Sequence, residues 1–295
     1  MKVFVYGAGQ FGKTVVKAFT DYSNRFSDVS IGDPHIAAID DVPAKARAIK
    51  TLSDDSPDIV VITASAVPKA ARDRLAKMMA PIDRFWDLER KHNLRMLKSL
   101  LPWLTRTKWR MLIIGTNPVH EWVNALKVIF PDRQIVGLGT AFDNRRIKFL
   151  AAAMCPDKDM LVLRSLRILG GHGTAISASN GKVSAEVFDT AKWMSNALSV
   201  AFIKAPSDYA SLWWKKVAID PLVEGIAGIQ TQTHLVVPVS YKRTRAATSI
   251  DVIVNGFSLR PIIPKNLSAS ESRCYLEFLH KMQNIGRALA KQLTS

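Results

Sequence analysis

A single histidine lies among three glycines in the stretch LGGHGTAIS, which covers residues 169–177. Glycine has no side chain to pack and loses much backbone entropy on folding, so three of them around His172 need a reason. Histidine has an ordinary pKa of ~6.5, which suits it to proton transfer near neutral pH. His172 is therefore either a turn residue or an imidazole held at the floor of a pocket because it moves a proton.

A second glycine-rich stretch, GAGQFG at residues 7–12, follows the apolar run KVFVY and precedes a helical pattern. After a strand, GxGxxG spacing makes a tight turn and brings a pyrophosphate to the helix N-terminus, where amides and the helix dipole favour anions. This setting favours a dinucleotide site over a purely structural turn. The expected contacts are Gly7, Gly9, Gln10, Phe11 and Gly12.

An acidic residue ~20 residues beyond such a turn would hold the adenosine ribose and disfavour a 2′-phosphate. Asp33, after the second expected strand, lies near this spacing, and Asp40 is the rival. The alternative for either residue is a solvated turn aspartate. We therefore expect NAD as the cofactor, with NADP as the alternative.

Strands and helices alternate in the first half of the chain. Short apolar runs predict buried parallel strands, and a helical period recurs between several of them. The alternation predicts an α/β fold with a Rossmann-type doubly wound parallel sheet. The expected strands are residues 2–6, 29–32, 36–39, 58–63, 111–115 and 135–138, and the expected helices are residues 10–21, 83–104 and 121–129.

The second half predicts an α+β architecture with antiparallel strands. Pro221 is expected to kink or break a long helix, and Ser268 to cap a terminal one. We expect a dinucleotide-binding domain of residues 1–142 and a catalytic, substrate-binding domain of residues 143–295. The expected strands are residues 160–169, 233–241, 249–255 and 259–263, and the expected helices are residues 189–203, 208–229 and 269–293.

The composition is that of a folded protein, with 48% hydrophobic and 22% charged residues and a formal net charge of +16. This balance favours anionic partners: phosphate-bearing cofactors, carboxylate substrates, nucleic acid or anionic membranes. Because no basic block with interleaved aromatics occurs, no nucleic-acid partner is expected. Cys155 and Cys274 are far apart, and neither a signal peptide nor an apolar run of ~18 residues is recognised. We therefore expect a cytoplasmic protein without a membrane span, disulfide or metal site.

Several segments resemble, in order, those of the lactate and malate dehydrogenase family. They extend over nearly the whole chain, and their order and spacing are more specific than any one motif. The resemblance implies an NAD-dependent 2-hydroxy acid dehydrogenase that forms a homodimer or homotetramer. Besides the glycine turn and the terminal helix, the segments are DIVVITAS (58–65), GTNPVHEWV (115–123), GLGTAFDNRRIKFL (137–150), ILGGHGTAIS (168–177) and VPVS (237–240).

The resemblance assigns proton transfer to His172, its carboxylate partner to Asp143 and the clamp for the substrate carboxylate to Arg146. Asp143 and Arg146 are three residues apart, so they project from one side of a helix. A guanidinium offers the planar fork that a carboxylate accepts. Asn117 matches an asparagine that hydrogen-bonds the reacting oxygen. Further matched cofactor and substrate positions are Thr63, Ala64 and Ser211. The glycines are then expected to keep side chains away from a substrate beside His172.

One loop departs from the family, in which it carries an arginine that polarises the carbonyl and a residue that selects the substrate. Residues 64–93 read ASAVPKAARDRLAKMMAPIDRFWDLERKHN, a longer segment than the resemblance leads us to expect. Lys69 resembles the start of a malate-type loop and is a substrate-site candidate. The polarising arginine is expected at Arg84, with Arg72 as the alternative. Thr174, where the family has aspartate, and the extra charge of Arg145 both fit an atypical acidic substrate.

The function expected from these residues is hydride transfer between NAD(P)H and a lactate- or malate-like 2-oxo or 2-hydroxy acid. The alternative is a catalytically retired dehydrogenase fold that serves as a scaffold or binds anionic partners. The altered loop and the positive charge motivate this alternative. The presence of Asp143, Arg146 and His172 together favours the enzyme.

Overall fold

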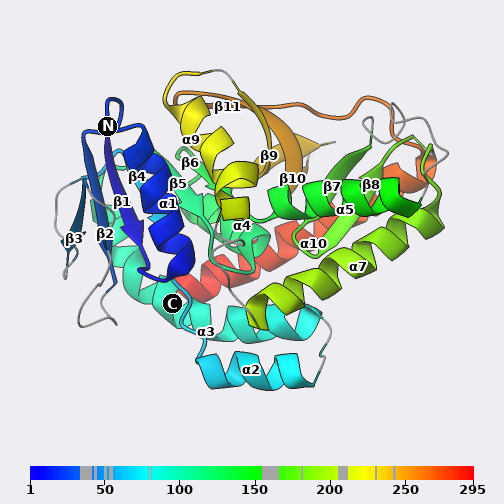
Figure 1. The fold of residues 1–295 in the computed structure, drawn as a ribbon, viewed down its shortest axis with the longest axis horizontal. Coiled ribbons are helices and arrows are strands. Elements are labelled where there is room, and N and C mark those ends of the chain that lie inside the picture. Colours follow the sequence, from blue (N-terminus) through cyan, green and yellow to red (C-terminus); the bar gives the residue numbers. More distant parts are fainter. Residues whose placement is uncertain are drawn as a thin grey trace.

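Eleven strands among the described residues form one continuous sheet (Figure 1). The computed structural model describes residues 1–33, 42, 45–49, 52, 56–78, 80, 82–154, 166–180, 182–204, 212–229, 231–241 and 244–295. The strand order is β3-β2-β1-β4-β5-β6-β9-β10-β7-β8, with β11 beside β10. Strands β1 to β6 pair in parallel, and the others pair antiparallel. The predicted doubly wound sheet followed by an antiparallel part is therefore confirmed.

The parallel strands come from the first half of the chain. They are β1 (Lys2–Tyr6), β2 (Asp28–Gly32), β3 (Ala46–Ile49), β4 (Ile59–Ile62), β5 (Met111–Ile114) and β6 (Gln134–Gly137). Apart from β3, these strands are mostly buried, as the apolar runs predicted. Strand β3 escaped prediction because its ARAI sequence is neither continuously apolar nor alternating. The strand expected at residues 36–39 lies outside the described residues.

The antiparallel strands are β7 (Arg167–Gly171), β8 (Thr174–Ala178), β9 (Thr231–Tyr241), β10 (Thr244–Asn255) and β11 (Ser258–Pro261). Strands β9, β10 and β11 match the last three expected strands, with ends that differ by at most five residues. The chain reverses between β7 and β8, which pair along residues 167–178, so His172 and Gly173 form the turn of a hairpin. The sequence did not predict β8, because the glycines concealed the continuing strand pattern.

Helices cover both faces of the parallel sheet. They are α1 (Gln10–Asp21), α2 (Lys69–Lys77), α3 (Ile82–Arg106), α4 (Val119–Ile129), α5 (Thr140–Met154), α7 (Ala185–Lys204), the π-helix η1 (Lys215–Ile219), α9 (Asp220–Ile226) and α10 (Ala269–Thr294). Ser268 caps α10 in a capping box with Glu271, as expected. Pro221 lies in the first turn of α9, directly after the π-helix η1, so the chain stays helical on both sides of the proline and changes helix type there instead of breaking. Within the described segments, none of the helices combines the length and apolarity that a membrane crossing requires.

The alternating side chains of β1 show how the two faces are filled. Val3 and Val5 belong to a core that includes Phe19 of α1, whereas Phe4 and Tyr6 belong to a second core with Leu97 of α3. Successive strand residues point to opposite faces, so one apolar strand supplies both cores. The loops after β1, β4, β5 and β6 leave the sheet at one edge, where ligands of such folds bind. The expected domain division after residue 142 falls in the first turn of α5 and stays a prediction.

Candidate active site

The GxGxxG turn has the backbone geometry that a bound pyrophosphate requires. Gly7 has a φ of +118°, which disfavours any side chain, and a Cβ there would overlap the backbone of Ala64. A Cβ on Gly12 would overlap the carbonyl of Gly7, so α1 can approach β1 only with glycine here. Gly9 caps α1, and nothing lies within 4 Å of the place where its Cβ would be. The turn therefore leaves open space at the helix N-terminus, which fits the phosphates of a dinucleotide.

The other expected cofactor residues surround this turn. Asp33 directly follows β2, and its Oδ2 accepts a hydrogen bond of 3.3 Å from the Ala8 amide. Thr63 donates its hydroxyl to the carbonyl oxygens of Tyr6 (3.3 Å) and Gly7 (3.1 Å). Gln10 and Phe11 begin α1, and the Phe11 ring lies 5.4 Å from that of Trp214. Asp33 thus lies beside the glycine turn and its role at the ribose stays a prediction, whereas Asp40 lies outside the described residues.

His172 meets Asp143 and Arg146 although it lies 29 residues beyond Asp143 in the sequence. His172 Nδ1 lies 2.6 Å from Asp143 Oδ2. The Gly173 amide donates to the same oxygen at 3.0 Å, and Arg146 Nη2 donates to Oδ1 at 2.9 Å. The acidic and basic side chains share one side of α5, as their spacing predicted, and the β7–β8 turn supplies the histidine. One buried carboxylate therefore orients both an imidazole and a guanidinium.

Electrostatics keep this carboxylate ionised. Burial alone would raise the pKa of Asp143, but the imidazole of His172, the charge of Arg146 and the Gly173 amide together lower it to about 2. Because Nδ1 of His172 faces the carboxylate, Nε2 is the nitrogen left to face a substrate. Arg146 Nε also donates to Ser195 Oγ at 3.2 Å, from α7. Ser195 was missed because nothing in its local sequence distinguishes it from other helix serines.

A tryptophan from the divergent segment covers the histidine. The rings of Trp86 and His172 lie 5.0 Å apart, and Trp86 is only 5% exposed. A Cβ on Gly173 would lie 2.8 Å from Trp86 Nε1, and the φ of this glycine is +77°. The third glycine around His172 therefore admits both the turn and the indole. Helical phase alone could have placed Trp86 on a buried face, but not against this histidine.

A second imidazole lies behind the turn. A Cβ on Gly171 would lie 2.9 Å from the ring of His120, which belongs to α4. Burial first, and then the charges of His172 and Arg90, lower the pKa of His120 to about 3, so it is neutral at physiological pH. The part of α4 that follows Asn117 thus lies beside the turn that carries His172.

In the described part of the chain, the two candidates for the polarising arginine and Lys69 make no hydrogen bond or ion pair with His172, Asp143 or Arg146. Arg84 is exposed, and because it lies two residues from Trp86 on α3 it projects from nearly the opposite side of that helix. Arg72 pairs instead with Glu89, at 3.0 Å, and Lys69 is exposed at the start of α2. Ser211 lies outside the described residues. The assignment of a polarising arginine therefore stays a prediction.

Relatives found by sequence are lactate dehydrogenases, and no protein-family model matches the chain. The L-lactate dehydrogenases of Clostridium perfringens (strain SM101 / Type A) and Clostridium botulinum (strain 657 / Type Ba4) are each 28% identical, over 198 and 169 residues. These matches cover 61% and 50% of this chain. They span only about half of the relatives' own lengths, 58% and 47%.

Relatives found by structure cover nearly the whole chain. Malate dehydrogenase from Plasmodium falciparum superposes with a TM-score of 0.71 at 17% identity, covering 99% of both chains. Cryptosporidium parvum lactate dehydrogenase, solved with lactic acid and nicotinamide adenine dinucleotide, gives a TM-score of 0.67 at 16% identity, covering 98% of this chain and 97% of the other. This likeness shows the fold. Together with the sequence matches it confirms the predicted resemblance to lactate and malate dehydrogenases.

Proposed function

We propose that this chain, which resembles lactate and malate dehydrogenases in sequence and fold, interconverts a 2-oxo acid and its 2-hydroxy acid with NAD(H). The observation that carries the proposal is the single buried carboxylate of Asp143, which contacts both His172 and Arg146. The open glycine turn at Gly9 supplies the second requirement, a site for the cofactor phosphates.

In the reductive direction, His172 Nε2 donates a proton to the carbonyl oxygen of the substrate. When bound, NADH supplies the hydride for the carbonyl carbon. Before proton transfer, Asp143 stabilises the imidazolium. Afterwards it accepts a hydrogen bond from Nδ1–H, which leaves Nε2 unprotonated and able to act as the base in the reverse direction. The balanced reaction consumes one hydride and one proton for each 2-hydroxy acid formed.

Arg146 is proposed to bind the substrate carboxylate. A guanidinium has five N–H donors, and the contacts to Asp143 and Ser195 use two of them. Asn117 is proposed to hydrogen-bond the reacting oxygen. For the polarising arginine neither candidate has geometric support, because Arg84 is exposed and the guanidinium of Arg72 is held by Glu89.

Asp33 favours NAD over NADP, because a carboxylate beside the ribose disfavours a 2′-phosphate. The first 142 residues are proposed to bind the cofactor and residues 143–295 to complete the substrate site. Assembly into a homodimer or homotetramer in the cytoplasm stays a prediction from the resemblance.

The decisive test is binding followed by turnover. Purified protein is titrated with NADH and with NADPH, following energy transfer from tryptophan to the nicotinamide, and a panel of 2-oxo acids is then screened. We expect tighter binding of NADH, turnover of a lactate- or malate-like substrate, and loss of turnover without loss of NADH binding in His172→Ala. If that variant kept a near-normal kcat, the proposed mechanism would be wrong, and binding of neither nucleotide would favour the scaffold alternative.

A further inference from the structure

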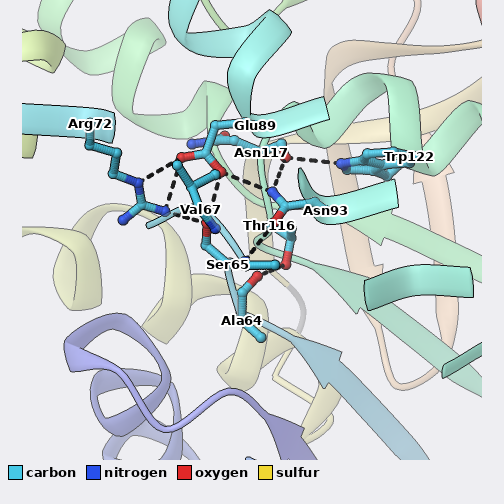
Figure 2. A network of polar contacts seen from close by, with 10 residues as sticks. Ala64, Ser65, Val67, Arg72, Glu89, Asn93, Thr116, Asn117 and Trp122 are labelled. Atoms are coloured by element: carbon cyan, nitrogen blue, oxygen red, sulfur yellow. Dashed lines mark hydrogen bonds and ion pairs between the residues drawn. The ribbon is translucent and has the colours of Figure 1, made fainter. Parts of the chain in front are cut away.

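A buried carboxylate outside the proposed catalytic group joins α2 to the loop after β4 (Figure 2). Glu89 of α3 is 7% exposed. Its Oε1 accepts hydrogen bonds from Arg72 Nε at 3.1 Å and pairs with Arg72 Nη2 at 3.0 Å. Its Oε2 accepts from Ser65 Oγ at 2.9 Å and from Asn93 Nδ2 at 2.8 Å. Arg72 also donates to Ser65 Oγ, so three elements meet at one carboxylate.

Asn93 carries this connection to the loop after β5. It is 0% exposed, and its Oδ1 accepts from the Ala66 amide at 2.8 Å. Its Nδ2 donates to Glu89 and also, at 2.8 Å, to the carbonyl oxygen of Asn117. The indole of Trp122 donates to the same carbonyl at 2.9 Å. The backbone of Asn117 is thus held from two sides, one of which leads through Asn93 to Glu89 and Arg72.

Helix α2 packs against α3 and α7, but little of it is buried. Ala76 is the one buried residue among its nine, and it belongs to a small apolar cluster with Phe85 and Trp86. Figure 1 shows α2 on the outer side of α3. A buried carboxylate that loses its cationic partner is strongly destabilised, so Glu89 ties α2 to α3 more firmly than an exposed pair would.

We propose that Arg72, Glu89 and Asn93 are positioning residues that couple the placement of α2 to the placement of Asn117. The inference rests on the proposed function, in which the Asn117 side chain holds the reacting oxygen. It assigns Arg72 a role that needs no contact with substrate, since Glu89 and Ser65 hold its guanidinium. Displacing Asn117 by a fraction of an ångström would misalign the carbonyl, so the coupling acts on kcat.

The first test measures this coupling without relying on activity. Amide hydrogen exchange of the full-length protein is followed by mass spectrometry in wild type, Arg72→Ala and Arg74→Ala. Arg74 is an exposed arginine of the same helix, and it makes no ion pair with the described residues, so its variant is the matched control. The amide of Ala66 is the reporter nearest to Asn93.

In Arg72→Ala we expect amide exchange to become about tenfold faster in α2. We expect the same acceleration in residues 63–68 and 115–122, because the loss of a buried hydrogen bond makes local opening more frequent by about this factor. Arg74→Ala should exchange like wild type. Faster exchange confined to α2, with residues 63–68 and 115–122 unchanged, would overturn the coupling. Glu89→Gln, which keeps the shape but removes the charge, should reproduce the pattern of Arg72→Ala.

The second test separates kcat from KM on the 2-oxo acid that wild type reduces, at saturating NADH. A positioning role predicts that Arg72→Ala and Glu89→Gln lower kcat about tenfold while KM changes by less than about threefold, and that Arg72→Lys recovers part of the loss. A kcat equal to that of Arg74→Ala would overturn the positioning role. Absence of turnover in wild type itself would refute the proposed function instead, and hydrogen exchange would then decide the coupling alone.

Discussion

Replacing Asp143 by asparagine removes one charge from the centre of the proposed site. A pKa of about 2 in place of 3.8 corresponds to ~2 kcal/mol in favour of the ionised carboxylate. Much of this comes from the imidazole at 2.6 Å, so the substitution removes the charge that faces the imidazole. The amide can also donate to Nδ1 of His172, which selects the wrong tautomer. We therefore expect Asp143→Asn to lower kcat by ~10²–10⁴-fold, the range seen when the orienting carboxylate of a histidine is neutralised.

Steady-state reduction of the preferred 2-oxo acid by NADH, measured from pH 6 to 8, checks this expectation. Energy transfer from tryptophan to bound NADH should be unchanged, because the glycine turn is not altered. Asp132→Asn, at an exposed aspartate, is the matched control and should behave as wild type. A kcat of Asp143→Asn within threefold of wild type would refute the assigned role of the carboxylate.

Four further predictions concern the glycine turn, the ribose site, Trp86 and the stability of the protein at low pH. Gly9→Ala should leave the melting temperature unchanged, since its Cβ meets nothing within 4 Å, yet weaken NADH binding at least ~10-fold by filling the phosphate space; equal NADH affinity would contradict the phosphate assignment. Asp33→Ser should narrow the preference for NADH over NADPH, and titration with both nucleotides will show no change if the aspartate is only a turn residue. Trp86→Ala should lower the free energy of unfolding by ~3 kcal/mol in urea titrations, whereas Trp86→Phe should lose clearly less; similar losses would place the indole outside the packed site. Because the folded-state pKa of Asp143 is about 2, its contribution to stability is present above its unfolded-state pKa of ~3.9 and is lost as pH falls towards 2. Acid unfolding of Asp143→Asn should therefore be less pH-dependent between about pH 4 and 2 than that of wild type, and identical curves would count against the ion pair.

Local patterns predicted most of the first half of the fold. The runs around β1, β4 and β5 are continuously apolar, and a strand buried on both faces needs just such a run. The capping box at Ser268 is a contact between residues three apart, so it can be read directly from the chain. Strand β3 could not be predicted this way, because its position depends on pairing with β2 rather than on its own residues.

The candidate site also combines features that the sequence predicts with features that it does not. Asp143 and Arg146 share one side of a helix by virtue of their spacing alone, and the geometry of GxGxxG follows from the glycines themselves. The sequence therefore determined which side chains were available for proton transfer, carboxylate binding and phosphate binding.

Only the tertiary structure decided what surrounds them. Trp86 against His172, and Asn93 between Glu89 and Asn117, are contacts between segments whose relative placement depends on how helices pack on the sheet. Periodicity predicts that a side chain is buried, but it does not predict which distant residue it will meet. The pairing of Arg72 with Glu89 could not be predicted for this reason: the sequence offered Arg72 only as a candidate for the polarising arginine, and the packing of α2 on α3 brings it to the buried carboxylate of Glu89.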